Sequence, residues 1–179
     1  CVVNNVGTAF AVYEAVQKNK PLIERVVTIT GKGLKTPGNF LARIGTSIAD
    51  LLSYCGYNAD HEAKIISGGP MMGKAVTTSD IPMVKGTSGI LVLEEGVERV
   101  AIEPCIRCGR CTRVCPMGLE PYLLAMASSK KMYDITESHA IMDCIECGSC
   151  QYICPAGRPL LDYVRLGKSE TGKIMRSRK

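Results

Sequence analysis

Residues 104–116 read PCIRCGRCTRVCP, which places four cysteines within eleven residues and ends on a proline. Residues 143–155, DCIECGSCQYICP, nearly repeat this stretch, so both have the spacing C-x2-C-x2-C-x3-C-P. Three thiolates spaced in this way can surround one corner of an iron–sulfur cubane, while the fourth cysteine points away and the proline turns the chain out of the loop. The two stretches, named here the first motif and the second motif, therefore predict two [4Fe-4S] clusters.

The spacing also predicts which cysteines share a cluster, because in proteins with two such runs the fourth cysteine of each run binds the other cluster. We expect one cluster to be bound by Cys105, Cys108, Cys111 and Cys154. We expect the other to be bound by Cys144, Cys147, Cys150 and Cys115. This crossing brings the two clusters close together, as electron transfer between them requires. Gly109 and Gly148 allow each loop to curl and to offer backbone N–H groups to the sulfurs.

Zinc and disulfides are the alternatives for these cysteines. Zinc sites usually use two separated C-x2-C pairs or mixtures of Cys and His, without a third cysteine at the same spacing. The only histidines, His61 and His139, lack metal-ligand spacing. A disulfide framework would spread its cysteines along a short secreted chain, whereas the first 104 residues contain only Cys1 and Cys55. The pattern indicates iron–sulfur ligands in a reducing, cytosolic setting.

Charge and hydropathy exclude several classes of function. The chain has 22 basic and 17 acidic residues, a formal net charge of +5. The thiolates and the cores of two clusters would bring the loaded protein close to neutrality, so the basic excess does not indicate nucleic acid. No apolar run approaches the roughly 18 residues needed to cross a bilayer. No arrangement of Ser, His and Asp, or of Cys and His, indicates a hydrolase.

The two motifs differ in charge. The first contains Arg107, Arg110 and Arg113, whereas the second contains Glu146 and no basic residue before Arg158. The arginines predict that the first cluster has the higher reduction potential, since nearby positive charge favours the reduced form, or that it faces an acidic partner. Solvated arginines on an exposed loop are the alternative interpretation.

The rest of the chain predicts an α+β protein with a small β-grasp module followed by a mainly helical, two-[4Fe-4S] ferredoxin-type domain. In residues 25–75, RVVTIT, GNFLARI and KIIS have strand-like patterns, and Ser47 caps a helix that ends at Gly56. In residues 104–167, a helical stretch follows each motif, LEPYLLAMASSKK after the first and PLLDYVRLGK after the second. These ranges are the two expected domains.

Three further segments flank or connect the domains. Residues 1–24 contain one helix, with Val12 and Val16 on its apolar face, and look like the tail of a truncated domain. The chain begins with Cys and has no signal peptide, which suggests a piece of a longer protein. Residues 76–103 read as a connecting strand, SGILVLEE, with a loop, and residues 168–179 as a basic, mobile tail.

The glycine-rich segment SGGPMMG, residues 67–73, could be mistaken for a phosphate-binding loop. It lacks both the lysine-serine ending of a P-loop and the spacing of a dinucleotide fingerprint, so we expect a tight turn packed by methionine. Cys55 is expected to be a buried small apolar residue. We expect four methionines to fill cores: Met71, Met72, Met83 and Met117.

The two motifs, together with IISGGPMMGKAV (65–76) and KGTSGILVL (85–93), resemble the C subunit of the Rnf complex. This complex is a membrane-associated ferredoxin:NAD⁺ oxidoreductase that pumps Na⁺ or H⁺, and the resemblance extends over nearly the whole chain. It implies a flavin- and NADH-binding domain joined to a soluble-ligand-binding β-grasp module and a two-cluster ferredoxin domain. Residues 1–24 would then be the tail of that truncated flavin- and NADH-binding domain. The chain would then be the electron relay between the flavin and partner subunits.

The resemblance also implies a flavin contact near the start of the chain. VNNVGT, residues 3–8, resembles the V-N-N-V-E-T element that lies beside the flavin in relatives from respiratory complex I. Asn4, Asn5 and Thr8 are therefore candidate flavin-binding residues, although Gly7 replaces the glutamate. FMN and NADH are expected only together with the N-terminal domain that this chain does not contain. An Asn-rich turn that caps the next helix is the structural alternative.

The expected partners are the other membrane and iron–sulfur subunits of the Rnf complex, with no nucleic acid. The expected location is peripheral, on the cytoplasmic side of the bacterial inner membrane. Two other functions stay open. One is a cobalamin reductase of the propanediol-utilisation type, which combines a similar flavin domain, β-grasp module and ferredoxin motifs. The other is a ligand-binding module attached to a structural metal domain.

Overall fold

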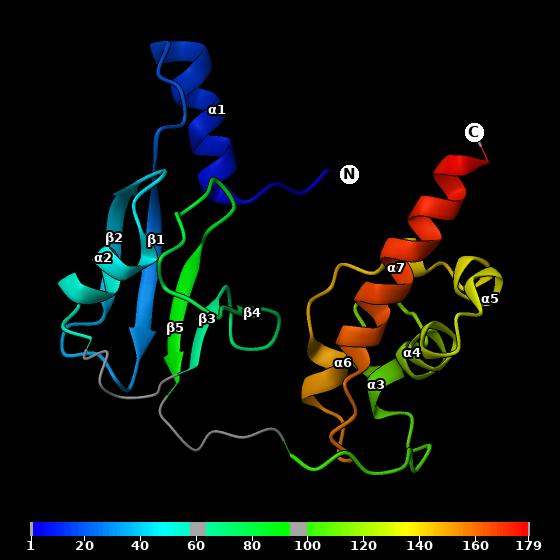
Figure 1. The fold of residues 1–179 in the computed structure, drawn as a ribbon. Helices are drawn as coiled ribbons and strands as arrows, with labels where there is room; N and C mark the ends of the chain where they lie inside the picture. The colour runs from blue at the N-terminus through cyan, green and yellow to red at the C-terminus, as the bar shows by residue number, and fades with distance from the viewer. Residues whose placement is uncertain (1, 58–63, 94–99, 179) are drawn as a thin grey trace. The chain divides into compact units, whose positions relative to one another are not determined.

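The computed structural model describes residues 2–57, 64–93 and 100–178 (Figure 1). The chain forms two compact units, Cys1–Val97 and Glu98–Lys179. The first is built on a β-sheet and the second is helical, so the predicted α+β class is confirmed. The histidine at position 61, the cysteine at position 1 and the end of the strand predicted in SGILVLEE lie outside the described residues.

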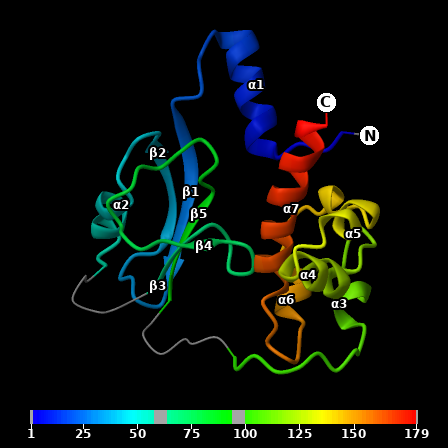
Figure 2. The ribbon, with the colours of Figure 1, turned by 45° about the vertical axis from the view of Figure 1, so that its right-hand side comes forward.

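The first unit contains a five-stranded sheet with the order β2-β1-β5-β3-β4 (Figure 2). Its strands are β1 (Glu24–Gly31), β2 (Gly38–Arg43), β3 (Lys64–Ser67), β4 (Lys74–Ala75) and β5 (Gly89–Leu93). Strands β1 and β5 pair in parallel, and the other neighbours pair antiparallel. The strands predicted from RVVTIT, GNFLARI and KIIS are confirmed as β1, β2 and β3.

Strand β5 lies in the middle of this sheet, although the sequence placed it in a connecting segment. Four of its residues pair with β1 and four pair with β3. Its alternate residues Ile90 and Val92 are buried, as a half-buried strand requires. The sheet therefore extends beyond the expected 25–75 module, because a parallel pairing between distant segments leaves no local signal in the sequence.

The core of the first unit joins the sheet to α2 (Ile48–Tyr54). The Ser47 hydroxyl accepts a hydrogen bond from the Ala49 N–H at 3.1 Å, which is the predicted cap at the start of this helix. Cys55 follows the helix and is fully buried, as is Met83, so both are core residues as expected. Gly56 then ends the helical path with a φ of 71°.

The SGGPMMG segment forms the predicted tight turn between β3 and β4. The Gly73 N–H donates to the Gly69 carbonyl at 2.7 Å. A Cβ at Gly73 would lie 2.4 Å from Ile66 Cγ2, so only glycine fits there. The prediction that the two methionines of this turn, and Met117, fill a core is wrong, since all three are exposed.

Helix α1 (Val6–Lys18) precedes the sheet and has no buried residue. Its predicted apolar face includes Val12 and Val16, which are both exposed in the described structure. In the described part of the chain, no helix combines the length and the apolar character needed to cross a membrane.

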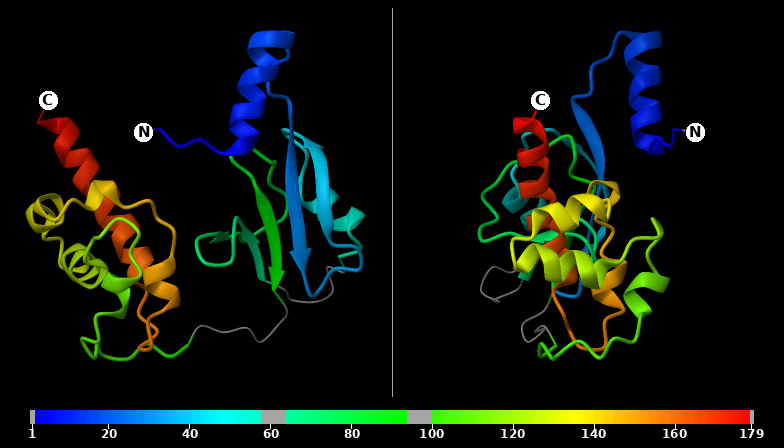
Figure 3. Two further views of the ribbon diagram at one scale, coloured as in Figure 1. Left: turned by 180° about the vertical axis from the view of Figure 1, so that it is seen from behind. Right: turned by 90° about the vertical axis from the view of Figure 1, so that its right-hand side faces the viewer.

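The second unit is helical (Figure 3). Its helices are α3 (Arg110–Arg113), α4 (Pro121–Ser129), α5 (Tyr133–Ser138), the 3-10 helix η1 (Ile141–Asp143), α6 (Ser149–Tyr152) and α7 (Leu160–Ser177). The two longest, α4 and α7, follow the two motifs as predicted and pack along each other. Leu124, Ile141, Leu160 and Val164 form the centre of the core between them.

The C-terminal segment, expected as a basic, mobile tail from residue 168, is helical as far as Ser177, where α7 ends. Gly167 lies inside α7, where a Cβ would be 1.9 Å from Ser128 Oγ of α4. Beyond it, the buried Thr171 hydroxyl is 2.7 Å from the buried Thr136 hydroxyl of α5. These two contacts hold the last turns of α7 against the unit.

Candidate iron–sulfur sites

The loops of the two motifs have the same backbone conformation. Arg107 and Glu146, which precede the second cysteine of each motif, have φ values of 55° and 56°. Gly109 and Gly148, which follow that cysteine, have φ values of 69° and 82°. Positive φ is uncommon for residues other than glycine, so its occurrence at equivalent positions shows that both loops curl in the same way. The curl also turns backbone N–H groups inward: the Glu146 N–H donates to Cys144 Sγ at 3.4 Å.

The repeat continues through the following elements. Each loop leads into a single-turn helix, α3 or α6, which carries the third cysteine of its motif. The fourth cysteine and a glycine with positive φ, Gly118 or Gly157, come next, and then a long helix, α4 or α7. Helix α3 contacts α6, and α4 packs along α7. The two halves of the unit therefore face each other through equivalent elements.

The eight cysteines of the motifs line two cavities in this unit. The first cavity is lined by Cys105, Cys108, Cys111 and Cys154. The second cavity is lined by Cys144, Cys147, Cys150 and Cys115. Each cavity thus brings together the four cysteines that the sequence assigned to one cluster, three from one motif and the fourth from the other. That these thiols bind clusters stays a prediction.

The two cavities differ in exposure and in lining. The first has a volume of about 230 Å³, and Cys105 and Cys108 at its mouth are exposed. The second has a volume of about 20 Å³, because apolar residues of α4 and α7 close over it. These include Leu124, Leu161 and Val164. The second cavity is therefore the narrower of the two, and apolar side chains form much of its lining.

The ionisation of the thiols follows from these surroundings. Burial raises the pKa of the Cys150 thiol to about 11 and also raises the pKa of the Cys144 thiol. At Cys147, a hydrogen bond with the Ser149 hydroxyl, 3.4 Å from Sγ, lowers the pKa. Without a bound cation, these two partly buried thiols keep their protons, since both pKa values lie above the ordinary 9.0. Metal binding must therefore displace their protons.

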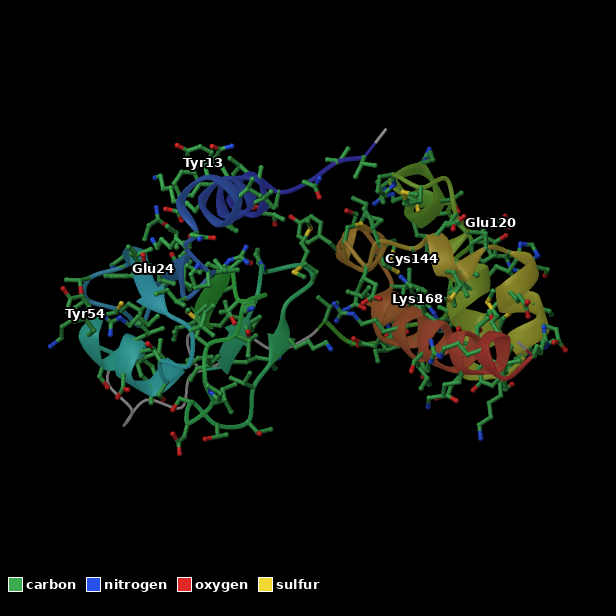
Figure 4. All side chains as sticks on the ribbon, turned by 90° about the horizontal axis from the view of Figure 1, so that it is seen from above. Tyr13, Glu24, Tyr54, Glu120, Cys144 and Lys168 are labelled. Carbon is green, nitrogen blue, oxygen red and sulfur yellow. The ribbon has the colours of Figure 1, made fainter. Side chains whose placement is uncertain are left out.

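Helix α7 holds the loop of the second motif by charged contacts, which the sequence analysis missed. The Lys168 ammonium donates to the Cys144 carbonyl at 2.5 Å (Figure 4). The Glu146 carboxylate lies 3.0 Å from Arg165 Nε and 3.6 Å from Lys168 Nζ. No local pattern could have shown these contacts, since the loop and the middle of α7 are separated by α6 and a turn.

The donor set fits an iron–sulfur cluster better than a single ion. Within residues 2–57, 64–93 and 100–178, no three Cys, His, Asp or Glu side chains converge closely enough to hold one metal ion. A tetrahedral zinc site needs its ligands at about 2.0–2.3 Å from one atom. Four thiols that line one cavity suit a cubane, in which each thiolate binds its own iron. His139 lies outside both cavities, 3.5 Å from Glu120.

The predicted flavin-binding residues lie at the start of α1, in the first unit. Asn5 caps this helix, since its side-chain oxygen accepts a hydrogen bond from the Gly7 N–H at 2.9 Å. Asn4 and Thr8 are exposed beside it. The capping role is thus observed, and a flavin contact stays a prediction.

Two family models match the chain. Residues 26–75 match the SLBB domain, and residues 99–155 match the 4Fe-4S dicluster domain. The first match covers most of the strands of the sheet, and the second covers both motifs. The second match supports iron–sulfur clusters of the 4Fe-4S type in this part of the chain.

Curated relatives share most of the chain. The C subunit of the proton-translocating ferredoxin:NAD(+) oxidoreductase complex of Clostridium ljungdahlii is 49% identical over 171 residues, which cover 94% of this chain and 37% of the relative. Its Na(+)-translocating counterpart from Acetobacterium woodii is 45% identical over 170 residues, 94% of this chain and 38% of the relative. The C subunit of the ion-translocating oxidoreductase complex of Rhodobacter capsulatus is 43% identical over 124 residues, 69% of this chain and 24% of the relative.

The chain thus spans between about a quarter and two fifths of the length of these relatives. The resemblance inferred from the motifs is confirmed by their identity over most of the chain. Over nearly its whole length, this chain is a homologue of part of the C subunits of ion-translocating ferredoxin:NAD(+) oxidoreductase complexes.

Proposed function

We propose that this chain is the electron-relay part of such a C subunit and passes single electrons through two [4Fe-4S] clusters. The observation that best supports the proposal is the exchange of the fourth cysteine between the two motifs, which gives each cavity four thiols. When bound, each cluster supplies the ability to take up and release one electron. The shared ligands keep the two sites adjacent, which single-electron transfer needs.

The residues around the cysteines have separate tasks in this proposal. The positive φ values at Arg107 and Glu146 curl the loops so that three thiols of each motif point inward. Lys168 fixes the loop of the second motif through the Cys144 carbonyl. The apolar side chains of α4 and α7 line the second cavity, where they limit the access of solvent and lower the local dielectric, which tunes the redox potential of a bound cluster.

The rest of the electron path lies outside this chain. We propose that NADH and FMN bind in a domain absent from this chain, beside Asn4, Asn5 and Thr8 of the first unit, and that hydride transfer occurs there. The proposed partners are the membrane and iron–sulfur subunits of the complex, to which the electron transfer is coupled for Na⁺ or H⁺ pumping. The proposed location is peripheral, on the cytoplasmic side of the membrane. The names of the relatives favour this function over a cobalamin reductase.

Paired cysteine substitutions test the crossed ligand sets. In the chain reconstituted without oxygen, we expect about eight iron and about eight acid-labile sulfide atoms per chain. In Cys105→Ala/Cys154→Ala, both lost thiols belong to the first cavity. This variant should therefore keep one intact cluster, with about four iron atoms per chain and one reducible [4Fe-4S] signal in electron paramagnetic resonance.

The matched control is Cys105→Ala/Cys115→Ala, which removes one thiol from each cavity. We expect this variant to lose or degrade both clusters, although it also lacks only two cysteines. If instead Cys105→Ala/Cys115→Ala retains one intact cluster and the other pair retains none, each motif binds its own cluster and the crossed assignment is wrong. Wild-type chain with zinc and no sulfide would contradict the electron-relay function itself.

A further inference from the structure

Three arginines of the first motif lie together at one surface of the second unit. Arg107 and Arg110 line the first cavity. Arg110 and Arg113 are the first and last residues of the short helix α3. All three are exposed. We name Arg107, Arg110 and Arg113 the arginine patch.

The charges of this patch are not neutralised within the unit. Among the residues that the structure describes, none of the three arginines forms an ion pair. The Glu120 carboxylate accepts a hydrogen bond from the Tyr122 hydroxyl, which lines the first cavity, at 3.4 Å, and lies 3.5 Å from the His139 imidazole. Three guanidinium groups are therefore available to an outside partner.

The second cavity lacks such a surface. Glu146, at the position equivalent to Arg107, is paired with Arg165 and Lys168 of α7. The four thiols of the second cavity are only partly exposed, whereas Cys105 and Cys108 of the first are exposed. The first cavity, whose thiols a partner can approach, is thus the one that lies beside the arginine patch.

We propose that the arginine patch is the docking site of an electron-transfer protein with an acidic docking face, so that electrons enter or leave this chain at the first cavity. The proposal rests on the proposed electron-relay function. In the docked pair, one electron passes between the partner's redox centre and the first site, one being oxidised and the other reduced by a single electron, with no bond formed or broken. Charge complementarity raises the association rate and orients the partner.

Guanidinium groups suit this task. They stay ionised at all physiological pH values and pair with carboxylates in a fixed, two-pronged geometry. An exposed patch of this kind contributes more to the encounter rate than to the lifetime of the complex, and its effect is screened by salt. The signature of docking is therefore an association rate that falls steeply with ionic strength.

The test measures binding of an acidic two-[4Fe-4S] ferredoxin, as the probe, to the full chain reconstituted without oxygen. The variant Arg107→Gln/Arg110→Gln/Arg113→Gln should bind the probe about tenfold more slowly and more weakly than wild type at roughly 0.05 M salt. At about 1 M salt, where the Debye length is about 3 Å, the variant and the wild type should bind the probe at the same rate. The conservative variant with three lysines should restore most of the rate.

A matched control removes the same charge elsewhere in the unit. Lys130→Gln/Lys131→Gln/Arg176→Gln alters three exposed residues that line neither cavity. Lys131 has a φ of 58°, close to the 55° of Arg107, so each variant places one glutamine at a position with positive φ. We expect this variant to bind the probe within about twofold of wild type, because the lost charges lie outside the arginine patch.

Equal binding by the arginine variant and wild type, or an equal loss in the control, would overturn the proposal. So would binding of phosphatidylserine vesicles or of duplex DNA that depends on the patch while the ferredoxin probe does not bind. Iron, sulfide and dithionite reduction are measured on the same samples. Intact, reducible clusters together with patch-independent binding refute the docking site alone, whereas absent clusters in wild type refute the electron relay.

Discussion

Gly167 allows the two long helices of the second unit to touch, and its replacement by alanine should weaken that unit. A Cβ at this position would lie 1.9 Å from Ser128 Oγ, 2.8 Å from Ser128 Cβ and 3.0 Å from Ile141 Cδ1. Ser128 is buried, and its hydroxyl donates to the Leu124 carbonyl at 2.7 Å, so it has little freedom to move away. Helices α4 and α7 must therefore separate, or Ser128 must change rotamer.

Two opposing effects set the magnitude. Alanine is favoured over glycine inside a helix by about 1 kcal/mol. Overpacking of a buried contact costs typically 1–3 kcal/mol, and the 1.9 Å approach places Gly167→Ala at the upper end of that range. The net expectation is a loss of about 1–2 kcal/mol in the free energy of unfolding. For a unit of this size, that corresponds to a fall in Tm of roughly 5–15 °C.

The assay is thermal unfolding of the reconstituted chain, followed by helical circular dichroism and by the visible absorbance of the clusters. Gly172 provides the control, since a Cβ there would meet its nearest atoms at 3.5 Å, an ordinary contact. Gly172→Ala should leave Tm unchanged or raise it by a few degrees, because only the helix-propensity gain of up to about 1 kcal/mol applies. Adding Ser128→Ala to Gly167→Ala should restore part of the loss. A Gly167→Ala variant as stable as wild type would refute the reasoning.

Two further predictions concern buried polar groups. Thr136→Val should destabilise the second unit by about 1–3 kcal/mol, because it leaves the buried Thr171 hydroxyl without its partner at 2.7 Å. The double variant Thr136→Val/Thr171→Val should lose less stability than the single variant, since no hydroxyl is left unpaired. Denaturant unfolding measures the free energy of unfolding of both variants. Burial raises the pKa of the Cys55 thiol above its ordinary 9.0, so the folded chain keeps this proton while the unfolded chain ionises. Stability should therefore fall as pH rises above about 9, and iodoacetamide should label Cys55 only after unfolding; rapid labelling of the folded chain at pH 8 would contradict the burial.

Local patterns were sufficient for much of the fold. The alternation in RVVTIT and GNFLARI gave β1 and β2. The Ser47 cap was visible because a hydroxyl residue precedes an apolar helical pattern. The spacing of the cysteines grouped them as the two cavities do, since a short loop leaves few ways to place three thiols around one point.

The errors come from interactions between distant segments. Nothing in the sequence of β5 states that it pairs in parallel with β1, so its central place was missed. The helical stretch PLLDYVRLGK was expected to end at Lys168, whereas α7 continues to Ser177, and the close approach at Gly167 is to Ser128 on another helix. The contact of Lys168 with the Cys144 carbonyl likewise depends on the path of α7 over the loop of the second motif. Tertiary packing decided each of these cases against the local preference.

The exchange of one cysteine between the halves of the second unit bears on how this unit can be divided. A fragment that ended between α5 and η1 would retain three thiols for the first cavity and one for the second, and its complement would retain the reverse. Neither fragment contains all four thiols of a site, although the two loops have the same cysteine spacing. The two halves should therefore fold and take up metal in a single cooperative event. Oxidation of Cys115 or Cys154 would remove a ligand from the cavity formed mainly by the other half.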